Sequence, residues 1–441
     1  MAIPEMEKYR NYTCACGKTH DFSGEVISGS GAIGELPRVL RERGIRRPFI
    51  IADENTYAAA GKQTVSLCRE AGAEPSVFIF REKKLEPEES SVGLAMMHYD
   101  YAADACIGVG SGVINDISKI VAAVADKPYI IVGTAPSMDG FASATSSVTR
   151  DGLKISLPSK AAEVIIGDTD ILAAAPVRMM LSGLGDMLAK YVSICEWRLA
   201  NRITGEYYCP EIAELVRSAL KKCVDNADGL LRRDKAAVQA VFEGLVLSGA
   251  AMKYVGVSRP ASGMEHYISH VFDMRGVEFG TPMDFHGIQC AVGTLTAVKL
   301  YERIKKITPD REKGARYVEN FDLAAWNEQL RAFFGRGAED MIRLEEKEHK
   351  YDPQAAEVRR AVICDAWDEL MAIVEEELPS AAALTELFDR LGIPKSVTEI
   401  GQPAEILPMT LKATKDIRDK YVLSRLLWDL GILDALCENA E

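Results

Sequence analysis

Short apolar runs alternate with helical patterns in the first part of the chain. The runs at residues 46–56, 74–84, 103–112 and 127–137 are rich in strand-forming residues and end in polar or glycine-rich turns. The stretches between them have the spacing of helices. This alternation predicts βαβ units and a parallel sheet, with ligands bound at the carboxyl ends of the strands.

The pattern changes after Pro176, where long amphipathic helical segments dominate. The length and this change predict two domains, an α/β nucleotide-binding domain over residues 1–175 and an α-helical domain over residues 176–441. The expected fold class is α/β, a Rossmann-like parallel sheet followed by an all-α region, with the active site in the cleft between them. Residues 303–380 are rich in charge and indicate a solvated helical face.

Composition excludes several classes of protein. The formal net charge of −13 at pH 7 argues against nucleic acid or an anionic membrane surface as the main partner. The N-terminal segment lacks the apolar core of a signal peptide, and no apolar run is long enough for a transmembrane helix. The ten cysteines are scattered, as expected for free thiols. A cytoplasmic enzyme is the class that these observations favour.

The run at residues 106–120 reads as a strand, a glycine loop and a helix. Gly108, Gly110 and Gly112 would let the backbone approach a pyrophosphate, whose charge the helix N-terminus favours. The spacing is G-x-G-x-G rather than G-x-G-x-x-G, so an ordinary tight turn explains the loop equally well. Asp53 ends an earlier strand, where its carboxylate could bind an adenosine ribose or cap the next helix.

Histidines and one buried carboxylate form a candidate metal site. His266 and His270 are four residues apart, about one helical turn, so one helix face would carry both. His286 follows in the next helical segment, and Asp186 lies in an apolar pattern where a carboxylate is costly unless it is paired or ligating. An Asp and two His would give a three-ligand site with an open position, as catalytic metals need. The alternative for Asp186 is a helical ion pair with Lys190.

A separate cluster lies near the N-terminus, where the segment CACGKTH contains Cys14, Cys16 and His20. These residue types bind structural zinc. However, Cys-x-Cys is not the usual Cys-x₂-Cys spacing, and the sequence shows no second Cys/His cluster to complete the site. The spacing therefore argues against a zinc site at this segment.

Six segments in a fixed order carry a resemblance to a known family. They are GSGVINDISK, TAPSMDGFAS, GLGDMLAKY, GMEHYISH, FHGIQ and KDIRDKYVLSRLLWDLGIL. Together they resemble the sn-glycerol-1-phosphate dehydrogenase family, in the superfamily of iron-type alcohol dehydrogenases, glycerol dehydrogenase and dehydroquinate synthase. The resemblance spans residues 20–300 and 405–435.

Site roles follow from this resemblance. It implies that Asp186, His266 and His286 bind the metal, and that the catalytic residues are His270 and Asp186. It also implies that Asp139, Asp186 and His270 contact the substrate. The residues that would bind the nicotinamide cofactor are Asp53, Gly112, Val113, Ile114, Asn115, Asp116, Thr134, Ala135, Pro136, Ser137 and Ser143.

Individual residues favour one metal, one cofactor and one phosphate contact over others. Iron-type alcohol dehydrogenases have a fourth ligand where this chain has Lys190, which favours zinc or nickel as the one divalent metal ion. Asp53 favours NAD over NADP because a 2′-phosphate would meet its negative charge. Arg259, just before the metal-binding segment, is the candidate for the substrate phosphate. His270 could relay a proton, since an ordinary imidazole titrates near neutral pH.

The activity implied by the resemblance is metal-dependent hydride transfer between NAD(P)H and dihydroxyacetone phosphate, giving sn-glycerol 1-phosphate. Such an enzyme belongs to phospholipid metabolism and is expected to be a cytoplasmic homodimer. Two alternatives use the same scaffold: a glycerol dehydrogenase acting on a free polyol, and a dehydroquinate-synthase-like NAD-dependent lyase and cyclase. A non-catalytic nucleotide- or metal-binding protein ranks last, because it has no use for an open metal position.

Overall fold

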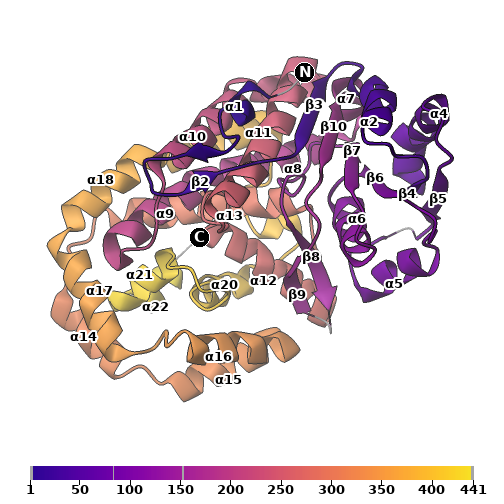
Figure 1. Ribbon diagram of the computed structural model, residues 1–441. Coiled ribbons are helices and arrows are strands. Elements are labelled where there is room, and N and C mark those ends of the chain that lie inside the picture. Colours follow the sequence, from indigo (N-terminus) through magenta and orange to yellow (C-terminus); the bar gives the residue numbers. More distant parts are fainter. Residues whose placement is uncertain (1–2, 83, 151–152, 439–441) are drawn as a thin grey trace. The chain divides into compact units, whose positions relative to one another are not determined.

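The computed structural model describes residues 3–82, 84–150 and 153–438 (Figure 1). The chain divides into two compact units, each built from segments that are separate in the sequence. They are Met1–Met187 with Glu214–Val257, and Leu188–Ala213 with Ser258–Glu441. The sequence predicted a nucleotide-binding domain up to residue 175 and an α-helical domain from residue 176. This assignment of domains stays a prediction.

A six-stranded parallel sheet forms the centre of the first unit. Its strand order is β3-β10-β7-β6-β4-β5, and every neighbouring pair is parallel. All residues of β6, β7 and β10 are buried, which explains why such strands read as continuous apolar runs. The predicted parallel sheet is therefore confirmed. The strands are β3 (Glu25–Gly29), β4 (Pro48–Asp53), β5 (Ser76–Phe80), β6 (Ala105–Gly110), β7 (Tyr129–Gly133) and β10 (Val164–Asp168).

Helices connect these strands and pack on the sheet (Figure 1). Leu36 and Val39 of α2 and Val65 of α4 pack in one core with Ile50 and Ile107 of the sheet. Burying each such side chain stabilises the fold by about 1.5–3 kcal/mol. The helices between the strands are α2 (Leu36–Glu42), α3 (Glu54–Thr56), α4 (Lys62–Glu70), α5 (Glu89–Met97) and α6 (Gly112–Val124).

Two antiparallel hairpins accompany the sheet, formed by β1 with β2 and by β8 with β9. Helix α11 is buried along most of its length and ends at Gly256, whose φ of +77° terminates the helix. The remaining elements up to residue 257 are α1 (Pro4–Glu7), β1 (Tyr12–Thr13), β2 (Thr19–His20), β8 (Thr145–Arg150), β9 (Leu153–Pro158), α7 (Thr169–Ala174), α8 (Val177–Leu188), α9 (Lys190–Thr204), α10 (Pro210–Asp225) and α11 (Lys235–Val255).

The second unit is helical, as expected for the later part of the chain. Its α12 and α13 pack closely against each other, and both have buried residues along most of their length. Within the described residues, no helix combines the length and the apolar character needed to cross a membrane. The helices after residue 257 are α12 (Met264–Phe279), α13 (His286–Ile304), α14 (Arg311–Glu319), α15 (Leu323–Phe334), α16 (Ala338–Lys347), α17 (Pro353–Asp365), α18 (Trp367–Glu377), α19 (Ala381–Leu391), α20 (Leu407–Ala413), α21 (Leu423–Asp429) and α22 (Leu433–Cys437).

Candidate functional site

The first two glycines of the predicted nucleotide loop lie within β6 and allow close packing. A Cβ added to Gly108 would lie 2.7 Å from the hydroxyl oxygen of Tyr129, and one added to Gly110 would lie 2.5 Å from Cβ of Ile114. Real Cβ atoms essentially never approach other atoms so closely, so these positions need glycine for α6 and β7 to pack on β6. Gly108 and Gly110 therefore have a packing role, and contact of the loop with a pyrophosphate stays a prediction.

Gly112 begins α6 at the carboxyl end of β6. The loop at residues 134–137, which follows β7, is hydrogen-bonded to the same end of β6. Thr134 N–H donates to the carbonyl of Gly110 (3.0 Å), and Ser111 Oγ donates to the carbonyl of Ala135 (3.1 Å). Ser111 Oγ also lies 2.5 Å from Ser137 Oγ. Two of the predicted cofactor segments thus lie side by side where a helix N-terminus favours an anion.

The polar side chains among the other predicted cofactor residues form hydrogen bonds within the protein. Asn115 donates to the carbonyl of Gly140 (3.1 Å) and accepts from the Tyr129 hydroxyl (3.1 Å). Asp116 accepts from the backbone N–H of Ser147 (3.2 Å), and burial raises the pKa of this carboxyl. Ser143 Oγ accepts from the backbone N–H of Thr145 (3.0 Å) in a local turn. Val113 is half-buried and Ile114 is buried. A cofactor contact at these positions would come mainly from the backbone.

Asp53 is the last residue of β4 and also the N-cap of α3. Its Oδ1 accepts from the N–H of Thr56 (2.8 Å), while Thr56 Oγ1 accepts from the N–H of Asp53 (3.0 Å). The alternative from the sequence, a helix-capping role, is thus present in the structure. It does not exclude the ribose role, because the capping bond uses only one carboxylate oxygen.

One side of α8 approaches the loop that carries Asp139. A Cβ on Gly183 would lie 1.9 Å from the carbonyl oxygen of Pro136, so only glycine permits this approach. One turn later, Asp186 Oδ2 accepts from the N–H of Asp139 (2.9 Å). Asp139 in turn accepts from Ser248 Oγ (2.8 Å). Two predicted substrate residues, Asp139 and Asp186, are therefore neighbours in the first unit.

The two predicted histidine ligands are neighbours in the second unit. His266 lies in the first turn of α12 and His286 begins α13. Their ring centroids are 5.1 Å apart. The thiol of Cys290 lies 3.5 Å from Nε2 of His286, and the ligand atoms of all three residues lie within 4.8 Å of one another. Cys290 was not singled out in the sequence, although its spacing of four residues from His286 on one helix was visible.

Neighbouring polar groups orient both imidazoles as metal ligands require. Nδ1 of His266 donates to Oε1 of Glu265 (2.8 Å), a carboxylate that also accepts from the N–H of Gly263 (2.7 Å). Nδ1 of His286 lies 3.2 Å from Oγ of Ser269. Metal-binding histidines characteristically have their second nitrogen held in this way, which leaves Nε2 for the ion. The residues present therefore fit a divalent metal.

Asp186, the predicted third ligand, belongs to the first unit, and its approach to the histidines stays a prediction. Lys190, its alternative partner, is fully buried and donates from Nζ to the carbonyl of Ala261 (3.0 Å).

His270 lies one turn after His266, and its ring is stacked on that of His286 at a centroid distance of 6.4 Å. Among the described residues, its Nδ1 is buried without a hydrogen-bond partner. Burial and the positive charge of Arg418 hold the pKa of His270 well below the ordinary imidazole value. The expectation of an ordinary imidazole pKa is therefore wrong. A neutral imidazole with an unused nitrogen can still accept a proton.

Arg259, the sequence candidate for a phosphate contact, has another role. Its guanidinium forms a two-pronged ion pair with Glu206 (2.5 and 2.6 Å) and donates to the carbonyl of Tyr421 (2.9 Å). These contacts engage all three guanidinium nitrogens, and the residue is only 1% exposed. Arg259 thus joins parts of the second unit.

Two cations near His270 were missed in the sequence. Both Arg418 and Lys420 lower the pKa of His270 through their charge. Lys420 donates to the carbonyl of Ser262 (2.8 Å), just before α12, and burial with repulsion from Arg259 lowers its own pKa to about 7. Both lie in a segment used for the family resemblance, but nothing in the sequence placed that segment beside α12.

Comparisons with known proteins agree with these features. The family model for iron-containing alcohol dehydrogenases matches residues 27–176. A glycerol-1-phosphate dehydrogenase (NAD(P)+) from Halalkalibacterium halodurans is 34% identical to the chain over 314 residues, which are 70% of this chain and 79% of the relative. Another protein of that name, from Bacillus licheniformis, is 28% identical over 428 residues, 96% of this chain and 94% of the relative.

The solved structure of a probable glycerol dehydrogenase from Sinorhizobium meliloti is similar in fold. The TM-score is 0.58 at 17% identity, and the match covers 94% of this chain and 97% of that one. Together with the parallel sheet and the helical second unit, this likeness confirms the expected fold class of a Rossmann-like parallel sheet and an α-helical region. The active site expected in a cleft between them stays a prediction.

Proposed function

The chain belongs to the glycerol-1-phosphate dehydrogenase family and is an oxidoreductase, and from this premise we propose that it interconverts dihydroxyacetone phosphate and sn-glycerol 1-phosphate. The geometry that supports the proposal best is the pair His266 and His286, each with Nδ1 beside a polar group. NAD(P) and a metal ion are its cofactors. Zinc or nickel as the ion, and a homodimer as the assembly, are further parts of the proposal.

The metal would be held by His266, His286 and Asp186. When bound, it polarises the substrate carbonyl as a Lewis acid, and the nicotinamide cofactor supplies the hydride. Glu265 and Ser269 keep the two imidazole rings in one orientation. The backbone N–H groups at the start of α6 and the loop at residues 134–137 would bind the cofactor.

His270 would exchange a proton with the substrate oxygen. Its low pKa keeps the imidazole neutral near pH 7, so it accepts a proton when the alcohol is oxidised. In the reverse direction, the imidazole would take up a proton from solvent and pass it to the oxygen that gains negative charge.

Arg418 and Lys420 would bind the substrate phosphate. Arg418 lies near His270, and a guanidinium can donate two parallel hydrogen bonds to a phosphate. A free polyol has no charge that would need these cations, so they favour a phosphorylated substrate over glycerol itself.

The phosphate provides a direct kinetic test. NADH oxidation by the purified protein should be fast with dihydroxyacetone phosphate and slow with dihydroxyacetone. Arg418→Gln should lower kcat/KM for the phosphorylated ketone by about 10- to 100-fold, because a hydrogen bond to a charged group contributes about 1.5–3 kcal/mol. The same variant should leave kcat/KM for dihydroxyacetone nearly unchanged. Equal activity of the wild type on both ketones would instead indicate a polyol dehydrogenase, and absence of net NADH oxidation would indicate a lyase.

Asp53 should favour NADH over NADPH, since its charge would repel a 2′-phosphate. Asp53→Asn removes the charge and keeps the cap of α3, because Asn and Asp cap helices about equally well. The ratio of kcat/KM for NADH to that for NADPH should fall by about tenfold or more, since like charges placed together cost several kcal/mol. An unchanged melting temperature confirms that the cap is intact. A wild-type preference for NADPH would refute this role for Asp53.

A further inference from the structure

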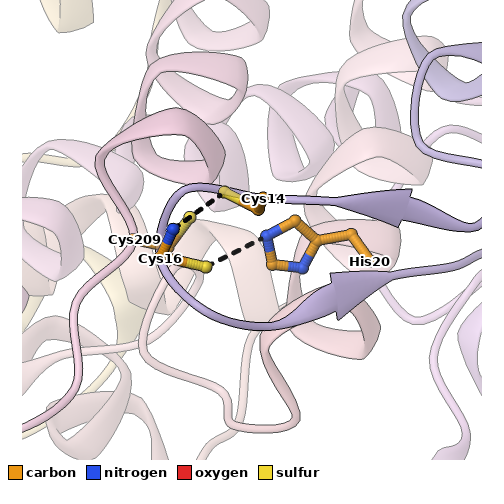
Figure 2. Close-up of side chains that lie close together, drawn as sticks. All are labelled: Cys14, Cys16, His20 and Cys209. Carbon is orange, nitrogen blue, oxygen red and sulfur yellow. Dashed lines mark hydrogen bonds between the residues drawn. The ribbon is translucent and has the colours of Figure 1, made fainter.

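The residues of the candidate site include neither the hairpin of β1 and β2 nor the charge-rich region over residues 303–380. In the hairpin, Figure 2 shows Cys16 beside His20, with Sγ 3.5 Å from Nε2. Nδ1 of His20 lies 3.0 Å from the carbonyl of Tyr254, and Nζ of Lys18 donates to the carbonyl of Val255 (2.8 Å). Polar side chains of the hairpin thus hold it against the end of α11, within the first unit.

The charge-rich region is only partly the solvated face that the sequence indicated. Trp326 of α15 is buried, and Lys350 and Tyr351, in the turn between α16 and α17, are half-buried. All three contact residues 414–422, a segment that joins α20 to α21 without regular secondary structure. This segment carries Arg418 and Lys420. Because it has no helix or strand of its own, its position depends on such contacts.

The Asp416 carboxylate anchors the segment. It is fully buried, and its Oδ2 accepts from Nε1 of Trp326 (2.9 Å), the hydroxyl of Tyr351 (2.6 Å) and Nζ of Lys415 (2.8 Å). Oδ1 accepts from the guanidinium of Arg425 (2.6 Å). Burial alone would raise the pKa of Asp416, but the charges of Lys415 and Arg425 hold it at about 2. The anchor is therefore an ionised carboxylate at pH 7, and two of its four donors come from the charge-rich region.

Aromatic rings of the same region surround this anchor. Nζ of Lys415 lies 3.3 Å from the ring centroid of Trp326, and the ring of Tyr351 is stacked on that of Phe321 at 5.2 Å. A cation over an aromatic face is held more strongly where water is excluded. The first half of the segment is thus fixed by both charge and packing.

Lys350 extends these contacts to Arg418. Its Nζ donates to the backbone carbonyl of Arg418 (2.5 Å), and its own carbonyl accepts from the guanidinium of Arg425 (3.2 Å). Burial lowers the pKa of Lys350 to about 8, so its ammonium is mostly charged at pH 7 and forms a strong hydrogen bond. The contact engages only the backbone of Arg418, and so it fixes the point from which that side chain extends.

The other side of Arg418 is fixed as well, because Nζ of Lys420 donates to the carbonyl of Ser262, just before α12 (2.8 Å). Arg418 thus lies between two fixed points of the second unit, and its charge reaches His270. A guanidinium can bind a phosphate through two parallel hydrogen bonds only in a defined position. A small displacement of the backbone would therefore weaken that contact.

We propose that Lys350 and Tyr351 are positioning residues that hold Arg418 in place for the substrate phosphate and so make the site selective for a phosphorylated ketone. This inference rests on the proposed function, in which Arg418 binds the phosphate. Lys350 acts through the backbone of Arg418, and Tyr351 acts through Asp416. Their contribution is thus expected only for substrates that Arg418 binds.

The test measures steady-state kinetics of full-length purified variants with dihydroxyacetone phosphate and with dihydroxyacetone. Lys350→Met keeps the unbranched apolar stem and removes the donor. It should raise KM for the phosphorylated ketone about tenfold, the usual effect of one hydrogen bond from a charged group. Its kcat, and its kinetics with dihydroxyacetone, should stay near the wild-type values. Lys350→Arg restores a charged donor and should recover most of the affinity.

Lys347→Met is the matched control. Lys347 is a lysine of α16 in the same region, its side chain is 78% exposed, and it pairs with the neighbouring Glu348. Its replacement should change neither ketone's kinetics. A loss of equal size on both ketones in Lys350→Met would indicate a general structural role and overturn the proposal, and so would an unchanged KM.

Arg418→Gln separates this inference from the proposed function. In that background, Lys350→Met should add little, because the side chain that it positions has already lost its charge. An undiminished further loss would overturn the proposal. If Arg418→Gln itself leaves the kinetics with dihydroxyacetone phosphate unchanged, the proposed phosphate site fails, and this inference fails with it. An effect of Arg418→Gln without one of Lys350→Met would refute the positioning role alone.

Tyr351→Phe is the second variant, and it decides the question if Lys350→Met fails to fold. It removes the hydroxyl that donates to Asp416 and keeps the ring that is stacked on Phe321. A melting temperature near that of the wild type would show that the fold is intact. An increase in KM confined to the phosphorylated ketone would support the proposal, and an unchanged KM would overturn it.

Discussion

Replacing His266 or His286 with alanine should remove one equivalent of metal per chain and lower kcat/KM by about 10³-fold or more. A catalytic metal is held by three protein ligands, so losing one leaves too few to retain the ion. A Lewis acid contributes several kcal/mol to the transition state, and each 1.36 kcal/mol is about tenfold in rate. Elemental analysis and steady-state kinetics on the same preparations measure both effects.

Two further variants identify the third ligand of this site. Asp186→Asn should lose the metal, as the histidine variants do, because an amide is a poor replacement for a carboxylate ligand. Cys290→Ala should retain it, although the Cys290 thiol lies near Nε2 of His286. The opposite pattern would replace Asp186 with Cys290 in the ligand set. Full metal content in both histidine variants would refute the site itself.

Replacing His270 with alanine should keep the metal but lower kcat by about 10²–10⁴-fold, the usual contribution of a general acid or base. On one helix, residues 266 and 270 share a face but lie about 6 Å apart along the axis. His270 can thus lie on the substrate's side of a metal held by His266. The buried Nδ1 has no hydrogen-bond partner among the described residues, which is expected for a group that exchanges its proton with substrate.

Tyr267→Phe is the control for His270→Ala. Tyr267 lies on the same helix with its ring centroid 6.3 Å from that of His270, and its buried hydroxyl makes no hydrogen bond within the described chain. Removing that hydroxyl perturbs the same region without affecting proton transfer, so kcat should stay near the wild-type value. Loss of metal in His270→Ala would make His270 a ligand, and an unchanged kcat would exclude it from the reaction.

The strands that could be predicted are those in which an apolar run of sequence alternates with a helical pattern. Strands β4, β5, β6 and β7 are central or carry long apolar runs, and helices separate them in the sequence, so their alternation was visible. Strands β3 and β10 were missed. β3 precedes the alternating region, and β10 follows the β8–β9 hairpin rather than a connecting helix.

The site residues that could be predicted are those whose residue type and spacing within a short stretch of sequence indicate metal binding. His266 and His286 were selected from their spacing and residue type, and they lie together. Arg418 was not, because only the folded chain brings it close to His270. Arg259 was assigned to the substrate phosphate for the same reason, because its partner Glu206 is distant in the sequence. The ion pair with Glu206 neutralises the charge that a phosphate contact would use.

The stereochemistry of the product tests the proposed reaction most directly. Purified enzyme loaded with zinc or nickel would be incubated with NADH and dihydroxyacetone phosphate, and the glycerol phosphate formed would be assayed with an enzyme specific for the sn-3-phosphate. The product should be sn-glycerol 1-phosphate alone, formed in an amount equal to the NADH consumed, and the chelated enzyme should form none. Formation of sn-glycerol 3-phosphate, or full activity after chelation, would contradict the proposed function.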